Sequence, residues 1–311
     1  MERLGDVREI GYSRRVLGYI YVSQEALPEA IREWSAALLP LEGAGVWVPA
    51  AQVRWHIGDA HLQMGNVDAA FQQYRTMSEI AVRHCNRRFA ANLLSKEGFE
   101  AARYGRLERA MEVRQQSLCL ARESGDPYVE GWCLWEMGEL CRLQGALNEA
   151  TDWFEQAHLL FNQLDEDQGR CFYYRGLADV AANRGDHAKA RRHFERSLAL
   201  AETNDHGWAA AYAHAGLARS LLALGKREQA THHAVTGLRV ARAAGDRAIA
   251  LAVLAATAAV LQETGRPDAA AALAAFVAAH PTSWEEVRTQ AQGLIAAAKH
   301  PLTVPEWADG Q

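Results

Sequence analysis

A short motif recurs every forty residues along the chain and limits the folds open to it. The hexapeptide GALNEA begins at residue 145, and related hexapeptides begin at residues 25, 65, 105, 185, 225 and 265. Each copy ends in alanine, and a glycine or a second alanine stands twelve positions before that alanine. A register kept over this length predicts one elongated repeat array, although 311 residues would ordinarily suggest two domains.

Each repeat has the residue spacing of a helical hairpin. In residues 127–167, apolar side chains recur three and four positions apart, as in Leu134, Met137 and Cys141, which is the period of an amphipathic helix. Gly145 interrupts this pattern, at a place where the residue just past a helix end commonly takes a positive φ. No alternating run of β-branched and aromatic residues indicates a strand. We therefore expect an all-α fold built from seven helix–turn–helix repeats, with small residues where the two helices of a hairpin approach each other.

Composition argues against several classes of protein. The formal net charge of −5 at pH 7 does not favour a nucleic-acid partner, because such partners usually require a basic surface. Five cysteines without a CxxC pair predict neither a disulfide framework nor a zinc site. The longest uncharged apolar run, residues 248–261, is shorter than the roughly 20 residues that span a bilayer. The sequence opens with no signal-peptide pattern. We predict a cytoplasmic protein that does not associate with membranes.

The order of large and small residues within a repeat resembles that of a known family. The pattern consists of Leu134, Met137, Gly138, Cys141, Gly145, Ala150, Phe154 and Ala157. It is similar to the tetratricopeptide repeat, and the resemblance extends from residue 5 to about residue 280. The repeat is forty residues long rather than the usual 34, and such long repeats resemble those of kinesin light chains and of bacterial signal-transduction ATPases with numerous domains (STAND proteins). The resemblance implies an α-α superhelix of seven hairpins over residues 1–280.

Both ends of the array carry a prediction. Gly5 and Asp6 align with Gly125 and Asp126 at a repeat junction, so residues 1–4 would be the last turn of a preceding helix. The chain would then be part of a longer protein, and a native start with a short stub is the alternative. Residues 283–299 are expected to form a capping helix that opens with a Ser283–Glu286 capping box. Residues 300–311 would form a loose tail.

No catalytic or metal-binding pattern is present in the sequence. Residues 225–227 (GKR) lack the upstream glycine and the Ser or Thr of a Walker A loop, and no HExxH, GxSxG or EF-hand pattern occurs. His232 and His233 are adjacent, and His56 and His61 are five positions apart, so neither pair has the i, i+4 spacing of a helical metal site. We predict no enzyme activity, no cofactor and no metal site.

The resemblance assigns one face of each first helix to a concave binding groove. On that face, aromatic rings alternate with arginines and a few acids, a composition typical of recognition surfaces. The predicted groove residues are Tyr12, Arg15, Tyr19, Trp55, Asp59, Lys96, Phe99, Arg103, Trp132, Trp135, Glu139, Arg142, Phe172, Arg175, Asp179, Tyr212 and Arg219. Their positive charge is concentrated in the middle repeats, which favours a partner that carries a carboxylate or phosphate group.

Two structural alternatives stay open for these residues. The aromatic side chains could wedge between adjacent hairpins, and the acidic members of the set could neutralise the arginines. The leading functional hypothesis is a non-catalytic module that binds a peptide, a protein segment or a small effector as the sensor region of a bacterial STAND-type regulator. The alternative is a scaffold that assembles complexes through its convex face or by end-to-end stacking, since an uncapped N-terminal hairpin would allow self-association.

Overall fold

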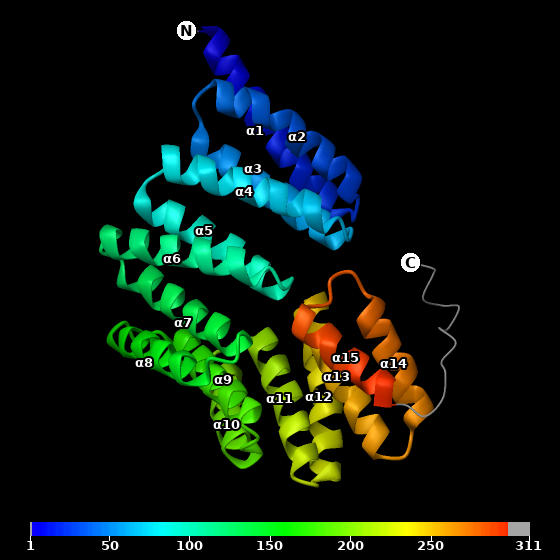
Figure 1. The fold of residues 1–311 in the computed structure, drawn as a ribbon. Helices are drawn as coiled ribbons and strands as arrows, with labels where there is room; N and C mark the ends of the chain where they lie inside the picture. The colour runs from blue at the N-terminus through cyan, green and yellow to red at the C-terminus, as the bar shows by residue number, and fades with distance from the viewer. Residues whose placement is uncertain (1, 298–311) are drawn as a thin grey trace. The chain divides into compact units, whose positions relative to one another are not determined.

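The computed structural model of the protein describes residues 2–297. Over that range the chain forms fifteen α-helices and no strand (Figure 1). The helices are α1 (Glu2–Ser23), α2 (Leu27–Gly43), α3 (Trp47–Gln63), α4 (Val67–His84), α5 (Arg87–Arg103), α6 (Leu107–Ser124), α7 (Pro127–Leu143), α8 (Leu147–Gln163), α9 (Asp167–Asn183), α10 (His187–Thr203), α11 (Gly207–Ala223), α12 (Arg227–Ala244), α13 (Arg247–Glu263), α14 (Pro267–Ala279) and α15 (Glu285–Ala297). The predicted all-α fold class is confirmed: seven successive hairpins are followed by one more helix.

The helices group into two compact units. The N-terminal unit comprises Met1–Ala102 and Glu108–Val129. The C-terminal unit comprises Glu130–Gln311 together with the short segment Arg103–Leu107.

The turn within each hairpin has the left-handed backbone that the repeat pattern predicts. The turn residue is Glu25 in the first hairpin and a glycine in the other six, and φ lies between 58° and 81° at all seven. In the fourth hairpin, the amide of Ala146 donates to the carbonyl of Cys141 at 2.9 Å and that of Gly145 donates to Arg142 at 3.0 Å. These bonds occupy carbonyls that the end of helix α7 would leave unpaired.

In the first four hairpins, the glycine of the first helix makes room for a large side chain sixteen positions later. A Cβ atom added to Gly138 would lie 2.5 Å from the ring of Phe154. Gly58 faces Tyr74 in the same way at 2.4 Å. The expectation that small residues bring the two helices together is therefore incomplete, because the freed space is filled by a side chain of the second helix.

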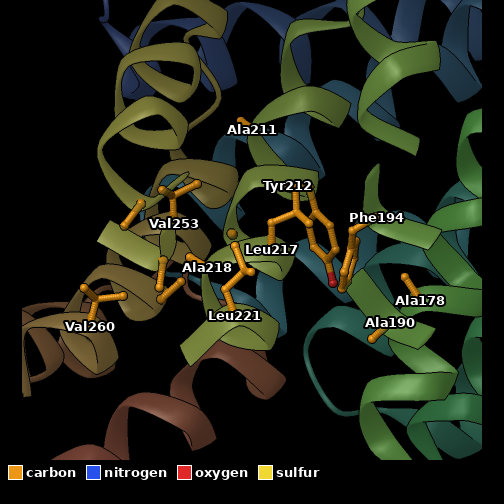
Figure 2. Close-up of a cluster of buried hydrophobic side chains, with 14 of the residues drawn as sticks. Ala178, Ala190, Phe194, Ala211, Tyr212, Leu217, Ala218, Leu221, Val253 and Val260 are labelled. Carbon is orange, nitrogen blue, oxygen red and sulfur yellow. The ribbon is translucent and has the colours of Figure 1, made fainter. Parts of the chain in front are cut away.

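The core of the C-terminal unit continues from one hairpin to the next. Phe194 of α10, Tyr212 and Leu221 of α11, and Val253 and Val260 of α13 belong to one buried cluster (Figure 2). This cluster joins helices of three successive hairpins, as expected where stacked repeats bury a continuous core.

The two ends of the array differ from the sequence-based expectation in one respect. Helix α1 runs without interruption through Gly5 and Asp6, so the repeat junction expected there is wrong. A glycine is accommodated inside a helix at a cost of about 1 kcal/mol relative to alanine. At the other end, α15 packs beside α13 and α14 (Figure 1), and its Val287 and Ala291 are buried against them. The predicted tail, residues 300–311, lies outside the described residues.

Candidate functional site

The predicted groove residues of the N-terminal unit lie near one another on α1, α3 and α5. Tyr12 and Tyr19 are exposed by 39% and 38%, and the others of this set, Arg15, Trp55, Asp59, Lys96 and Phe99, are half-buried. The ammonium nitrogen of Lys96 lies 3.8 Å from the centre of a Trp55 ring, and the Arg15 guanidinium lies 5.3 Å from that of Tyr12. These are cation–π distances, so both cations already have a ring as a neighbour.

His56 lies at the centre of this aromatic group. From the sequence, it was examined only as a possible metal ligand. Its ring is 5.1 Å from Tyr19, 5.4 Å from Trp34 and 4.8 Å from Trp55, measured between ring centroids. Burial lowers the pKa of His56 to about 4, helped by the positive charges of Lys96 and Arg15. The imidazole is therefore neutral at pH 7. The one sequence signal for its place is that it follows Trp55 directly on the same helix.

Asp59 is held by a tyrosine of its own hairpin. The Tyr74 hydroxyl donates to Asp59 Oδ1 at 2.5 Å. Burial raises the pKa of Asp59 to about 7, although the hydrogen bond from Tyr74 opposes the shift. This carboxyl group is therefore partly protonated near neutral pH.

In the C-terminal unit, Arg142 is the centre of a buried ionic cluster. Its guanidinium donates to both carboxylate oxygens of Glu286, with both N–O distances 3.0 Å, and its Nε donates to Glu139 at 3.2 Å. The Arg142 side chain is only 3% exposed. The bidentate geometry matches the planar fork of an arginine to a carboxylate, which is the strongest class of protein hydrogen bond.

Two more arginines extend the cluster. Arg175 donates to Glu139 Oε2 at 3.1 Å, and its guanidinium lies 4.6 Å from the rings of both Trp135 and Tyr212. Arg219 lies 3.8 Å from Asp179 and donates to Gln290 of α15 at 2.9 Å. The Tyr212 hydroxyl donates to Asp179 at 3.3 Å. We use the name arginine cluster for Glu139, Arg142, Arg175, Asp179, Tyr212, Arg219 and Glu286.

Asp179 and Glu286 of the arginine cluster have opposite pKa shifts. Burial alone would raise the pKa of Glu286, but the charge and hydrogen bonds of Arg142, with further attraction from Arg219 and Arg175, lower it to about 2. Burial raises the pKa of Asp179 to about 6, against the attraction of Arg142. Glu286 binds Arg142 through both carboxylate oxygens, and sequence reasoning missed this because Glu286 was assigned to a capping box.

The expected capping box does not form. The Ser283 hydroxyl is buried and has no hydrogen-bond partner among the described residues, while the Glu286 carboxylate binds Arg142. Beside it, the Trp284 ring lies 6.4 Å from the Tyr212 ring at an interplanar angle of 29°. The Arg103 guanidinium lies 4.2 Å from the Trp284 ring, so Arg103 faces an aromatic side chain of the same unit.

The aromatic members of the predicted groove in the C-terminal unit differ in burial. Trp135 and Phe172 are buried, and the Trp135 indole donates to the Phe172 carbonyl at 3.0 Å. Trp132 is half-buried, with its ring 4.9 Å from Phe172 and 5.2 Å from Phe161. These contacts join α7 to α8 and α9, as in the alternative that places the rings between hairpins.

In the described part of the chain, no three His, Cys, Asp or Glu side chains form a group that could hold a metal ion. Residues 2–297 likewise contain no helix with the length and apolar character needed to cross a bilayer.

The middle of the chain matches a known repeat family. Residues 132–203 match the tetratricopeptide repeat family. The chain has the tetratricopeptide repeat fold. This confirms the resemblance inferred from the repeat pattern, although no curated protein sequence matches the chain.

Three solved structures have a similar fold at low sequence identity. A STAND protein with a tetratricopeptide repeat sensor from Pyrococcus horikoshii is 16% identical (TM-score 0.57), and the match covers 95% of this chain and 43% of that one. A tetratricopeptide repeat protein from Parabacteroides merdae is 14% identical (TM-score 0.59; 93% and 99% covered). The Rap conjugation gene regulator of the plasmid pLS20, in complex with the Phr* peptide, is 14% identical (TM-score 0.61; 94% and 96% covered). This chain therefore spans less than half of the STAND protein it resembles.

Proposed function

We propose that this chain is a non-catalytic recognition module that binds a protein segment carrying an acidic group on the inner face of its first helices. The bidentate contact between Arg142 and Glu286 supports the proposal most directly, because it puts a carboxylate among charged and aromatic side chains of α7, α9 and α11. Aromatic side chains beside cations, as in Lys96 over Trp55, supply the rigid contact area that recognition surfaces use.

The comparisons favour a peptide or protein partner. The Rap regulator with this fold was solved with a peptide bound to it. The similar STAND protein carries its repeats as a sensor within a longer chain, so we propose the corresponding role here: the sensor or interaction region of a bacterial STAND-type regulator of signalling or transcription.

A displayed library of random twelve-residue peptides, panned on the full chain, tests the proposal. We expect enriched peptides to contain Asp or Glu, and their affinity by calorimetry to fall at least tenfold in Lys96→Gln or in Arg219→Gln. These two arms probe the N-terminal and the C-terminal set separately. Lys226→Gln is the matched control, because Lys226 is an exposed cation in the turn before α12. Enrichment without acidic residues, or equal affinity for all four proteins, would contradict the proposal.

A second candidate function is assembly of copies through helix α1. Large apolar side chains are exposed by 38–51% along this helix: Ile10, Tyr12, Val16, Leu17, Tyr19 and Ile20. An open apolar helix face is a surface for pairing with another copy. We expect sedimentation velocity to show a concentration-dependent dimer that Leu17→Glu abolishes and Leu159→Glu, on exposed α8 surface, does not. At about 100 μM protein, even a weak dimer with a Kd of about 100 μM would be populated. A monomer at every concentration up to that value would exclude this candidate.

A further inference from the structure

The start of helix α15 lies within the arginine cluster although it is far from that cluster in sequence. Glu286 and Arg142 are separated by 144 positions. Trp284 lies over Tyr212, and Gln290, one helical turn after Glu286, accepts from Arg219 at 2.9 Å. A short stretch of the chain therefore contacts four predicted groove positions, Arg103, Arg142, Tyr212 and Arg219, with an aromatic ring, a carboxylate and an amide.

The charges within the cluster show what Glu286 supplies. The hairpins contribute three cations, Arg142, Arg175 and Arg219, and two anions, Glu139 and Asp179. Without Glu286, these repeat side chains would carry one positive charge in excess in a buried place. An unpaired buried charge is strongly unfavourable, so the site requires an acidic group from outside the hairpins. Glu286 occupies that position.

Capping the last hairpin and filling the cluster depend on different side chains, although Trp284 also packs against the α13–α14 cluster. Val287 and Ala291 are buried against α13 and α14, which covers the apolar end of the array. Glu286 points to Arg142 instead. The helix could therefore keep its cap contacts while its first residues leave the arginine cluster.

The fit of this segment is incomplete. The indole nitrogen of Trp284 and the hydroxyl of Ser283 are buried without a hydrogen-bond partner among the described residues. Burying a polar group in this state costs free energy that an exposed or hydrogen-bonded group does not cost. A ligand that places the same ring and carboxylate in the site and satisfies its own polar groups would bind better than the segment itself.

We propose that Trp284–Glu286 is an intramolecular occupant of the recognition site, and that the partner is a protein segment of the same chemistry, with an aromatic residue two positions before an acidic residue. The inference rests on the proposed function and names its ligand class and its regulation. The tethered segment competes at an effective concentration in the millimolar range. The partner binds the C-terminal unit by displacing it, and α15 stays on α13 and α14 through Val287 and Ala291.

The test measures binding of a fluorescein-labelled synthetic peptide of residues 281–297 to the full chain. Fluorescence anisotropy of the labelled peptide reports the binding. We expect the full-chain variant Trp284→Ala/Glu286→Gln to bind this peptide at least tenfold more tightly than the unaltered chain. The peptide that carries Gln at the position of Glu286 should bind that variant at least tenfold more weakly. The matched control peptide carries Gln at the position of Glu285, which is half-exposed and pairs with Arg288, and its affinity should not change.

Each other outcome overturns a different part of the inference. Equal binding of the peptide to both proteins would show that the segment does not occlude the site, and would leave the recognition function standing. If neither protein binds the peptide while acidic library peptides still bind, the ligand class is wrong and the proposed function holds; if both fail, the proposed function fails as well. If the double variant loses its helical circular dichroism signal, Trp284 and Glu286 are required for folding and are not a displaceable occupant.

Discussion

Replacing Trp135 with alanine should lower the free energy of unfolding by about 3–5 kcal/mol, the usual range for truncating a buried large aromatic side chain. Trp135 is 1% exposed. Its ring lies 4.9 Å from Phe172 and 4.6 Å from the Arg175 guanidinium, so the substitution removes contacts between α7 and α9 and takes away one face of the arginine cluster. Urea denaturation followed by circular dichroism measures the loss.

Two companion variants separate packing from the hydrogen bond of the indole. Trp135→Phe keeps most of the ring and loses the bond to the Phe172 carbonyl, and we expect it to cost about 1–2 kcal/mol. Leu159→Ala removes an apolar side chain that is 62% exposed on α8, and should change stability by about 0.5 kcal/mol or less. If Trp135→Ala matched Leu159→Ala in stability and reduced only ligand affinity, Trp135 would be a ligand anchor and not a core residue.

The repeat period was a sufficient guide to the fold because its signals are local. The first helix of each repeat ends two positions before a residue with a positive φ. Six of the seven turns use glycine there, which adopts that conformation without steric strain. The first turn uses Glu25 at φ 58°, and the regular spacing of the other copies was enough to place it. The facing residue over each small position was not predicted, since Phe154 and Tyr74 are recognised as partners of Gly138 and Gly58 only once the hairpin is closed.

The candidate site was less accessible from the sequence because its decisive contacts are distant along the chain. The geometry of the family assigns one face of each first helix to the groove, and on that basis Arg142, Arg175 and Tyr212 were predicted as groove residues. It does not show what covers that face. Ser283 and Glu286 fit a local capping rule, but a guanidinium offers a carboxylate two charged N–H donors where the helix terminus offers one neutral N–H. The long-range pair prevails, and Glu286 contacts Arg142.

Arg142→Met should lower the free energy of unfolding by about 3–5 kcal/mol, because it deprives the Glu286 carboxylate of its bidentate partner and leaves Glu139 with Arg175 alone. The matched control is Arg227→Met, whose pair with Glu263 is exposed by 62% and 51% and should contribute about 1 kcal/mol or less. Adding Glu286→Gln to Arg142→Met removes the carboxylate that lost its bidentate partner, so the double variant should be more stable than Arg142→Met alone. Urea denaturation measures all three differences. Equal losses for Arg142→Met and Arg227→Met would mean that water reaches the cluster and screens it, and the same result would remove the charge argument that places an acidic ligand there.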